Sequence, residues 1–446
     1  MIVVVGAGSS GLAVARHASS MGEKVLLYDE GDLSVVRRRA GGELPSGVEL
    51  VQGLPGLEVM GEAETVVVSP GVPLSKLPVS LLEERGTEVI GEVEYAWRHL
   101  KGFFIGVTGT NGKSTVTTLV GEMLKREKER VFVGGNLSEP LTKACGGDYE
   151  TFVVELSSFQ LEGIRTFRPD VSVLLNVGED HMDRYSSFEE YAEAKMRIFE
   201  NQREEDAAVI NADDPEVVRR TSDIRPGKVM FSLSGREGAA ARFTGNGFEI
   251  SCRGETHFIP SSEVALSGRH NLENAMAASL AALWSGVSVE SVRGVLRAFK
   301  GLPHRMEFVG SVMGVDFFND SKGTNVHAVV RALSGIDRPV VLIAGGKDKG
   351  IDFGSLREAC RGKVKAAVLI GEAAQRLEES LGGVVETLRA GDMDEAVRAA
   401  FRRADPGDVV LLSPGCSSFD MFSSFEERGE IFRDSVRRLA LAQPAD

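Results

Sequence analysis

Cysteine is scarce in this sequence, and its cysteines stand apart from one another. Cys145, Cys252, Cys360 and Cys416 occur singly, and no CxxC pair is present. A disulfide framework needs paired cysteines, and a zinc ribbon needs closely spaced ones. The sequence therefore argues against both kinds of cross-linked scaffold and favours a reducing compartment.

Long hydrophobic runs are also missing. A helix that crosses a bilayer needs about 20 mostly apolar residues, and no run in this chain approaches that length. The beginning, MIVVVGAG, has a short apolar stretch that stops at a glycine and lacks the basic lead-in of a signal peptide. We expect no signal peptide, no membrane insertion and a cytoplasmic protein.

The chain has no excess of positive charge. Its 51 Lys and Arg residues are outnumbered by 65 Asp and Glu residues, which gives a formal net charge of -14 at pH 7. A surface that neutralises DNA, RNA or an acidic membrane needs the opposite balance. We expect no nucleic-acid partner, and any anionic ligand must be held by groups at its own site.

What the sequence does have is length and a recurring strand pattern. With 446 residues, of which 42% are hydrophobic, the chain has room for roughly three domains of about 150 residues each. Three times a β-branched run stops at a glycine: IVVVGAG from residue 2, FFIGVTG from residue 103 and VVLIAGG from residue 340. Continuous apolar strands of this kind are typical of parallel sheets that helices cover on both faces.

We predict an α/β protein with three domains, at residues 1–100, 101–300 and 301–446. The first and third are predicted to be Rossmann-like, and the second to hold a mostly parallel sheet. Further strands are expected at residues 24–28, 65–68, 151–156, 171–177, 207–210, 366–370 and 408–412. Residues 222–260 combine short alternating runs with many Gly, Ser, Thr and Arg residues, which indicates a small antiparallel addition to the second domain.

The strand near residue 103 continues into GVTGTNGKST, residues 106–115. A phosphate-binding loop needs glycines for close backbone approach, a lysine to offset charge, and a hydroxyl at a helix start for magnesium. These are supplied by Gly109, Thr110, Asn111, Gly112, Lys113, Ser114 and Thr115. The strict motif has a glycine where Val107 stands, so the match is to a variant.

The alternative is a Gly-Lys-Ser turn that merely starts a helix. A strand before the segment, a helix after it and the intact TGTNGKST favour the phosphate loop. We therefore interpret the second domain as P-loop ATPase-like. Lys113 is expected to neutralise the phosphates, and Ser114 to bind the metal.

Polar residues follow two other apolar runs of the second domain. Glu155 ends one run, and His181 and Asp183 follow another in GEDHMDRY. The carboxyl ends of parallel strands share one crevice, and magnesium prefers hard oxygen ligands. Each residue alone could be a helix cap or a polar loop residue. Together, beside the phosphate loop, they favour a metal site.

Lys195 lies in EAKMRIF, on a predicted helix further along the chain. A single lysine on a helix is usually a solvated surface group. Nothing in its spacing indicates another role.

The segment GAGSSG, residues 6–11, follows the first strand, and Asp29 ends the next one. This is the arrangement of a dinucleotide-binding fold, which by itself suggests an NAD-dependent oxidoreductase. A hydride-transfer enzyme has no use for a phosphate loop in its next domain. We therefore favour a first domain that binds another nucleotide-bearing molecule, with its diphosphate at the helix N-terminus. A nucleotide-gated switch protein is a further alternative, but it leaves the third domain unexplained.

Several segments, taken in order, resemble the Mur ligases of bacterial cell-wall synthesis: TGTNGKST, ELSSFQLE, GEDHMDRY, GRHNLENAMAA, GLPHRMEF and NDSKGTN. Two more, AGGKDKGIDF and LSPGCSSFDMFSSFEERG, resemble the branch that adds D-glutamate. The resemblance implies an ATP-dependent, amide-forming ligase of peptidoglycan precursor synthesis. Its implied substrates are UDP-N-acetylmuramoyl-L-alanine and D-glutamate. ATP and two Mg²⁺ ions are implied as cofactors, with Mn²⁺ as an alternative metal, and the implied state is a monomer.

The implied chemistry has a physical reason. A carboxylate is a poor electrophile, and phosphorylation gives it a leaving group that the D-glutamate amine can displace. Cations must then offset the charge on the transferred phosphoryl group and on the tetrahedral oxyanion.

The same motifs imply roles for individual residues. The implied metal ligands are Ser114, Glu155, His181 and Lys195, and Lys195 would first become a carbamate. The implied catalytic residues are Lys113, His181 and Lys195. The implied ATP contacts outside the loop are Asn274, Arg305 and Asp320. The implied substrate contacts are Ser9, Ser10, Ser69, Asn136, Lys322, Thr324, Lys349, Ser418 and Phe425. Three of these have ordinary alternatives: Ser418 as a turn residue, Phe425 as core and Lys349 as a solvated loop charge.

Overall fold

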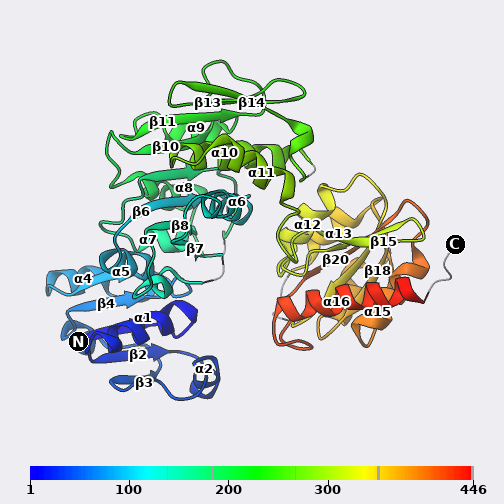
Figure 1. Cartoon of the computed structure of the whole chain (residues 1–446). Coiled ribbons are helices and arrows are strands. Elements are labelled where there is room, and N and C mark those ends of the chain that lie inside the picture. The colour runs from blue at the N-terminus through cyan, green and yellow to red at the C-terminus, as the bar shows by residue number, and fades with distance from the viewer. Residues whose placement is uncertain (138, 183, 267, 349–351, 443–446) are drawn as a thin grey trace. The chain divides into compact units, whose positions relative to one another are not determined.

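A computed structural model describes residues 1–137, 139–182, 184–266, 268–348 and 352–442. The chain divides into two compact units, Met1–Phe299 and Lys300–Asp446. The first unit holds two sheets and the second holds one (Figure 1). This confirms the predicted α/β class with mostly parallel sheets. The boundaries at residues 100 and 300 stay predictions, because the first two sheets belong to one unit.

The first sheet is entirely parallel, with strand order β3-β2-β1-β4-β5. The central strand β1 buries alternate valines on opposite faces, Val4 towards α1 and α2 and Val3 towards α3 and α4. Its strands are β1 (Ile2–Val5), β2 (Val25–Asp29), β3 (Val48–Gln52), β4 (Thr65–Val68) and β5 (Glu88–Gly91). Its helices are α1 (Ser9–Ser20), α2 (Leu33–Arg39), α3 (Leu57–Gly61), η1 (Leu74–Lys76), α4 (Val79–Glu84) and α5 (Glu92–His99).

The second sheet has nine strands in the order β14-β13-β12-β11-β10-β9-β6-β8-β7. All neighbours are parallel except β12, β13 and β14, which pair antiparallel at one edge. The predicted antiparallel addition is therefore confirmed for β12 to β14, as an extension of the main sheet, whereas β11, which also lies in the predicted range of residues 222–260, pairs parallel. The strands are β6 (Phe103–Thr108), β7 (Val131–Gly135), β8 (Thr151–Glu155), β9 (Val171–Leu174), β10 (Ala207–Asn211), β11 (Gly227–Ser232), β12 (Ala241–Phe243), β13 (Gly247–Cys252) and β14 (Glu255–Pro260).

Helices cover both faces of this second sheet, as its continuous apolar strands require. One face packs against α6, α10 and α11, and the other against α5, α7, α8 and α9. Figure 1 shows α6 and α10 next to each other, where they are in contact. The helices are α6 (Lys113–Lys125), η2 (Leu141–Ala144), α7 (Ser158–Glu162), α8 (Phe188–Met196), η3 (Arg197–Phe199), α9 (Pro215–Arg220), η4 (Ser261–Glu263), α10 (Arg269–Trp284) and α11 (Val289–Ala298).

The helix α5 joins the two sheets of the first unit. Gly91 N, just before α5, donates to Gly163 O at 2.7 Å, and a Cβ on Gly163 would lie 2.6 Å from Gly91 Cα. Glu94 is fully buried and accepts backbone N–H groups from three successive residues that begin at Arg165. A carboxylate held by several N–H donors is a strong anchor. This packing places the first glycine loop beside the second sheet.

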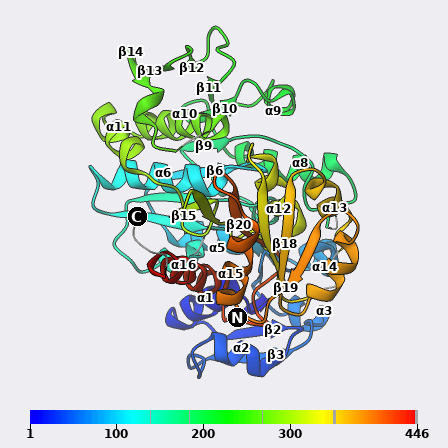
Figure 2. The same ribbon diagram turned by 90° about the vertical axis from the view of Figure 1, so that its right-hand side faces the viewer.

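The sheet of the second unit has the order β15-β16-β20-β17-β18-β19 and is parallel except for the β15–β16 pair. Helices α12 to α14 cover one face, and α15 and α16 cover the other. Figure 2 shows α14 beside β18 and β19. The strands are β15 (Glu307–Val312), β16 (Val315–Asn319), β17 (Val340–Gly345), β18 (Val364–Ile370), β19 (Glu386–Arg389) and β20 (Val409–Gly415). The helices are α12 (Val326–Ser334), α13 (Gly354–Cys360), α14 (Ala374–Leu381), α15 (Met393–Arg403) and α16 (Phe425–Leu441).

Across the described ranges, no helix is both long enough and apolar enough to cross a bilayer.

Candidate active site

The phosphate loop connects β6, which lies between β9 and β8 in the nine-stranded sheet, to α6. Gly109 has φ 151° and Gly112 has φ 83°, and the second of these values lies in the left-handed region that side chains disfavour. A Cβ on Gly109 would lie 3.0 Å from Leu175 Cβ, so the loop also packs tightly. The glycines of TGTNGKST are therefore required by the backbone itself.

Lys113 begins α6, and its Nζ donates to Gly109 O at 2.8 Å and to Thr110 O at 3.0 Å. The ammonium group thus lies over the loop, where it would meet a phosphate. Ser114 is buried and Thr115 half-buried in the first turn of the same helix. The helix N-terminus adds partial positive charge at this point.

Asn176 holds the far side of the loop. Its carbonyl accepts from Thr110 N at 3.0 Å, its Oδ1 accepts from Asn111 N at 2.7 Å, and its Nδ2 donates to Asn111 O at 3.2 Å. We predicted a strand over residues 171–177, but β9 ends at Leu174. The prediction was too long because the chain leaves the sheet there to bond with the loop.

Asn274 reaches the loop from α10. Its side chain is buried, and a Cβ on Gly112 would lie only 2.4 Å from Asn274 Oδ1. Helix packing therefore brings Asn274 against the phosphate loop, across more than a hundred residues of sequence. Its role in ATP binding stays a prediction.

Glu155 is the last residue of β8, which lies next to β6, and only one of its two carboxylate oxygens is hydrogen-bonded. Oε1 accepts from Asn136 Nδ2 at 2.8 Å, whereas Oε2 is buried without a hydrogen-bond partner. A buried carboxylate oxygen is costly to leave unpaired. The orphaned oxygen beside a phosphate loop therefore fits a Mg²⁺ ligand.

Lys195, on α8, is only 2% exposed, so the interpretation of a solvated surface lysine is wrong. Its Nζ donates to Gly109 O at 3.0 Å and lies 4.6 Å from the centre of the Tyr191 ring. Burial holds the pKa of Lys195 well below its usual value, and repulsion from Lys113 acts in the same direction. Asp180 and Glu155 oppose that shift.

His181 lies in the loop after β9 with its side chain 45% exposed. Its backbone has φ 56°, an uncommon left-handed conformation for a residue with a side chain. Its ring lies 4.8 Å from that of Phe159 and 6.5 Å from that of Tyr191. Among the described residues no three His, Cys, Asp or Glu side chains gather as a metal site, and Asp183 lies outside those residues.

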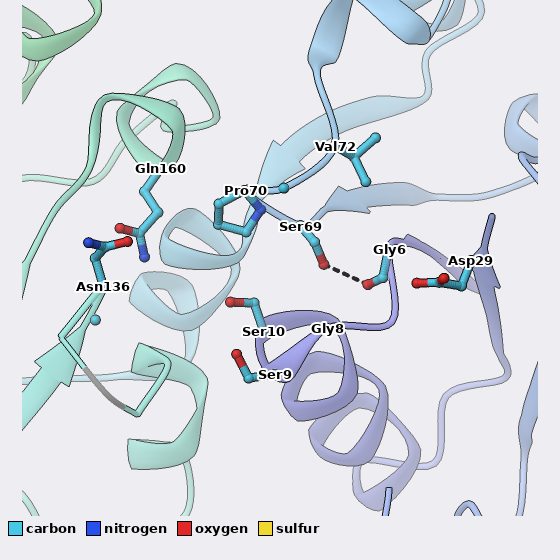
Figure 3. Close-up of a pocket in the computed structure, with 12 residues that line it drawn as sticks. Gly6, Gly8, Ser9, Ser10, Asp29, Ser69, Pro70, Val72, Asn136 and Gln160 are labelled. Atoms are coloured by element: carbon cyan, nitrogen blue, oxygen red, sulfur yellow. Dashed lines mark hydrogen bonds between the residues drawn. The ribbon is translucent and has the colours of Figure 1, made fainter. Parts of the chain in front are cut away.

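A pocket of about 450 Å³ opens where the first glycine loop meets the second sheet (Figure 3). The turn is tight: Ser69 Oγ donates to Gly6 O at 2.6 Å, and a Cβ on Gly11 would lie 1.9 Å from the same carbonyl. Asp29 Oδ2 accepts from Ala7 N at 2.6 Å. In Figure 3 the side chains of Asn136, which follows β7, and Gln160, on α7, lie across from the glycine loop. The pocket is lined by four predicted residues, Ser9, Ser10, Ser69 and Asn136, and by Gly135 and Gln160, which sequence reasoning missed.

The remaining predicted residues lie in the second unit. Lys322 Nζ lies 3.9 Å from the ring centre of Phe425, the first residue of α16, and Lys322 O accepts from Thr324 N at 2.8 Å. Ser418 is buried in the loop after β20, and its carbonyl accepts from Met421 N at 3.2 Å and Phe422 N at 2.9 Å, so it is a turn residue, and its contact with substrate stays a prediction. Lys349 lies outside the described residues.

Asp320 follows β16 and is almost completely buried. Its carboxylate accepts from Ser413 Oγ at 2.7 Å and from Met306 N at 3.3 Å. Burial raises the pKa of Asp320 to about 6. Arg305, between His304 and Met306, acts in the opposite direction on that pKa. Both of its neighbours have left-handed backbones, with φ 60° and 45°.

A buried arginine that sequence reasoning missed connects these loops. Arg428 on α16 donates to Ser321 Oγ at 3.0 Å, to Ser321 O at 2.9 Å and to Cys416 O at 3.1 Å. Ser321 Oγ in turn donates to Phe425 O at 2.8 Å. Burial lowers the pKa of Arg428 to about 10. Only the EERG that follows Phe425 could have drawn attention to it.

Three family models match the chain, in order. They are the MurD-like N-terminal domain of Mur ligases at residues 1–91, the Mur ligase middle domain at 107–282, and the Mur ligase glutamate ligase domain at 304–416.

Two curated relatives carry the name UDP-N-acetylmuramoylalanine--D-glutamate ligase. The one from Geotalea daltonii is 43% identical over 445 residues, which covers 98% of this chain and 97% of that protein. The one from Thermoanaerobacter pseudethanolicus is 40% identical over 447 residues, with 98% of each covered.

Solved structures share the fold at lower identity. A pseudomurein peptide ligase type C from Methanothermus fervidus has a TM-score of 0.59 at 19% identity, with 98% of this chain and 99% of that one covered. A UDP-N-acetylmuramate-alanine ligase from Thermotoga maritima has a TM-score of 0.57 at 19% identity, with 99% of each chain covered. The curated relatives are 43% and 40% identical to this chain and cover 98% of it. The chain therefore belongs to the Mur ligase family, in its MurD-like branch.

Proposed function

We propose that this protein is an ATP-dependent ligase that joins D-glutamate to UDP-N-acetylmuramoyl-L-alanine and releases ADP and phosphate. It works in the cytoplasm as a monomer and serves peptidoglycan precursor synthesis. The observation that carries the proposal is the orphaned Glu155 oxygen at the same sheet edge as the phosphate loop. The names of the curated relatives supply the substrates.

The phosphates of ATP would lie on the loop between β6 and α6. Backbone N–H groups at the start of α6 and the Lys113 ammonium offset their charge. Asn274 packs against Gly112, and we propose that it orients the nucleotide. Arg305 and Asp320 are proposed as further ATP contacts.

The metal-binding groups fit Mg²⁺, because Glu155 offers a hard anionic oxygen and Ser114 a hydroxyl near the phosphates. Bound Mg²⁺ would supply charge neutralisation at the transferred phosphoryl group. His181 is proposed as a ligand of a second ion, and Mn²⁺ offers the same coordination chemistry.

Lys195 is proposed to become a carbamate. Only a neutral amine attacks carbon dioxide, and burial beside Lys113 favours that neutral form. The nitrogen forms a bond to the carbon of carbon dioxide and releases one proton. The product is an anion, which would remove the repulsion between the two lysines and add a metal-ligating oxygen.

The reaction proceeds in two balanced steps. A carboxylate oxygen of the muramoyl-alanine attacks the γ-phosphorus of ATP, and the bond to ADP breaks. The neutral amine nitrogen of D-glutamate then attacks the acyl carbon and loses one proton, and the bond from that carbon to the phosphate oxygen breaks to release phosphate. Lys113 offsets charge in the first step. Lys322, Thr324, Lys349, Ser418 and Phe425 are proposed to hold D-glutamate for the second.

We propose that the nucleotide end of the muramoyl substrate binds in the pocket of Figure 3. Its diphosphate would accept from the N–H groups at the start of α1, where Ser9 and Ser10 lie. Asn136, which also holds Glu155, would connect this pocket to the metal site.

ADP release tests the function directly. The purified chain would receive ATP, Mg²⁺ and UDP-N-acetylmuramoyl-L-alanine, with D-glutamate, L-glutamate, D-lysine or meso-diaminopimelate as the amine. We expect ADP release with D-glutamate alone, and no turnover in Lys113→Ala. Preference for another amine would overturn the specificity, and release independent of any amine would overturn the ligase assignment.

A further inference from the structure

Arg184 links three parts of the first unit that the proposed mechanism treats separately. Its side chain is 14% exposed and therefore largely packed away from solvent. Its NH1 donates to Pro70 O at 2.9 Å, and its NH2 donates to Val72 O at 3.5 Å. Both carbonyls belong to the 69–72 turn that lines the nucleotide pocket, where Figure 3 shows Pro70 and Val72.

The same guanidinium also holds α7. Its NH2 donates to Glu162 Oε2 at 3.2 Å, and the Cζ atom of Arg184 lies 4.1 Å from the ring centre of Phe159. Gln160, between those two residues, lines the nucleotide pocket. A planar guanidinium can bond carbonyls, bond a carboxylate and stack on a ring at once, whereas a lysine ammonium cannot.

The backbone of Arg184 shapes the turn that presents His181. The carbonyl of His181 accepts from Arg184 N at 2.9 Å and from Tyr185 N at 3.2 Å. These bonds enclose the left-handed His181 backbone, with φ 56°. The Phe159 ring that stacks on Arg184 also packs against the His181 ring, at 4.8 Å. A strained backbone of this kind persists only where its surroundings hold it.

We propose that Arg184 is a positioning residue that couples occupancy of the nucleotide pocket to the placement of His181. Bound UDP would fix the conformation of the 69–72 turn, and with it the carbonyls of Pro70 and Val72 that the Arg184 side chain bonds. The backbone N–H of Arg184, which bonds His181 O, would in turn hold the His181 turn in place. Glu162 and Phe159 fix the guanidinium between them. This inference rests on the proposed function, because it takes the pocket as the UDP site and His181 as catalytic.

Histidine NMR tests the coupling without turnover. The chain has 7 histidines, and the His181 imidazole resonance is assigned as the one missing from His181→Gln. We expect UDP to shift this resonance in the unsubstituted protein and to leave it unmoved in Arg184→Lys. An equal shift in both proteins would overturn the proposal.

Kinetics provide the second readout. We expect Arg184→Lys to lower kcat about tenfold or more, with KM for ATP changed less than about twofold. Because Arg184 acts through His181, adding Arg184→Lys to His181→Gln should lower activity no further. A further loss by the same factor in the double variant would overturn the proposal, as would full kcat in Arg184→Lys.

Arg168→Lys is the matched control. Arg168 is 24% exposed and bonds Asp206 at 2.6 and 2.7 Å, at the amino end of the sheet. We expect Arg168→Lys to leave both the UDP-dependent shift of the His181 resonance and kcat unchanged. If the unsubstituted protein releases no ADP with D-glutamate, the proposed function fails, while the UDP-dependent shift still decides the coupling.

Discussion

The side chains of Lys113 and Lys195 share one acceptor, the carbonyl oxygen of Gly109. Their Nζ atoms lie 2.8 and 3.0 Å from it. Two ammonium groups this close repel, and Lys195 is the more deeply buried of the two. The neutral form of Lys195 is therefore favoured, which suits both the loop and the proposed carbamate.

Lys195→Met should stabilise the protein near pH 7, while abolishing ligase activity. The folded-state pKa of Lys195 is lowered below 10.5, so folding releases a proton and is penalised as pH falls. The gain in melting temperature over the unsubstituted protein should shrink as pH rises towards about 10. Calorimetry near pH 7 and near pH 10 measures this gain in melting temperature, with the exposed Lys125→Met as control. A gain that is the same at both pH values would contradict this account.

Glu155→Gln should abolish most activity without unfolding the protein. The amide can still accept from Asn136 but puts an N–H₂ group where Oε2 now lies. Loss of an anionic metal ligand is expected to reduce kcat by about a hundredfold or more. It should also remove the thermal stabilisation by Mg²⁺ and ATP. The exposed Glu150→Gln serves as control, and normal Mg²⁺ dependence in Glu155→Gln would exclude this ligand role.

Gly112→Ala should raise KM for ATP about tenfold or more. Its φ of +83° disfavours any side chain, and the new Cβ would lie 2.4 Å from Asn274 Oδ1. Gly146→Ala is a close control, because Gly146 has the same φ of +83° and nothing within 4 Å of the added Cβ. The two variants share the backbone strain, of about 1 to 2 kcal/mol. Equal effects of both on KM would show that Asn274 does not matter.

Asp320→Asn should stabilise the second unit near pH 8 while impairing ATP use. The pKa of Asp320 is raised to about 6 from 3.8, so its contribution to stability is present at low pH and is lost as pH rises through about 6. The amide can keep both hydrogen bonds, from Met306 and to Ser413. The gain in the free energy of unfolding should be of the order of 3 kcal/mol or less near pH 8, and smaller near pH 5.5. Melting curves at both pH values measure the gain, with the exposed Asp337→Asn as control. A gain that is the same at both pH values would contradict this interpretation.

Local patterns were sufficient for much of the fold. The predicted strand at residues 65–68 is β4, and those at 151–156 and 207–210 match β8 and β10 within one residue. Continuous Val and Ile runs specify buried parallel strands. Less apolar strands were missed, among them β3, β15 and β19, because their half-buried pattern resembles loop sequence.

The phosphate loop could be predicted from local sequence, because glycines at special φ values, a lysine and a hydroxyl must follow one another along the chain. The sequence also determined the family, through motifs spread over the whole length. Three relationships could be seen only in the folded chain: Lys195 is buried beside Lys113, Asn274 packs on Gly112, and Arg184 bonds the 69–72 turn. Those relationships depend on strand order and helix packing across many tens of residues. Local periodicity cannot encode them, since it records which face of an element is apolar and not what that face meets.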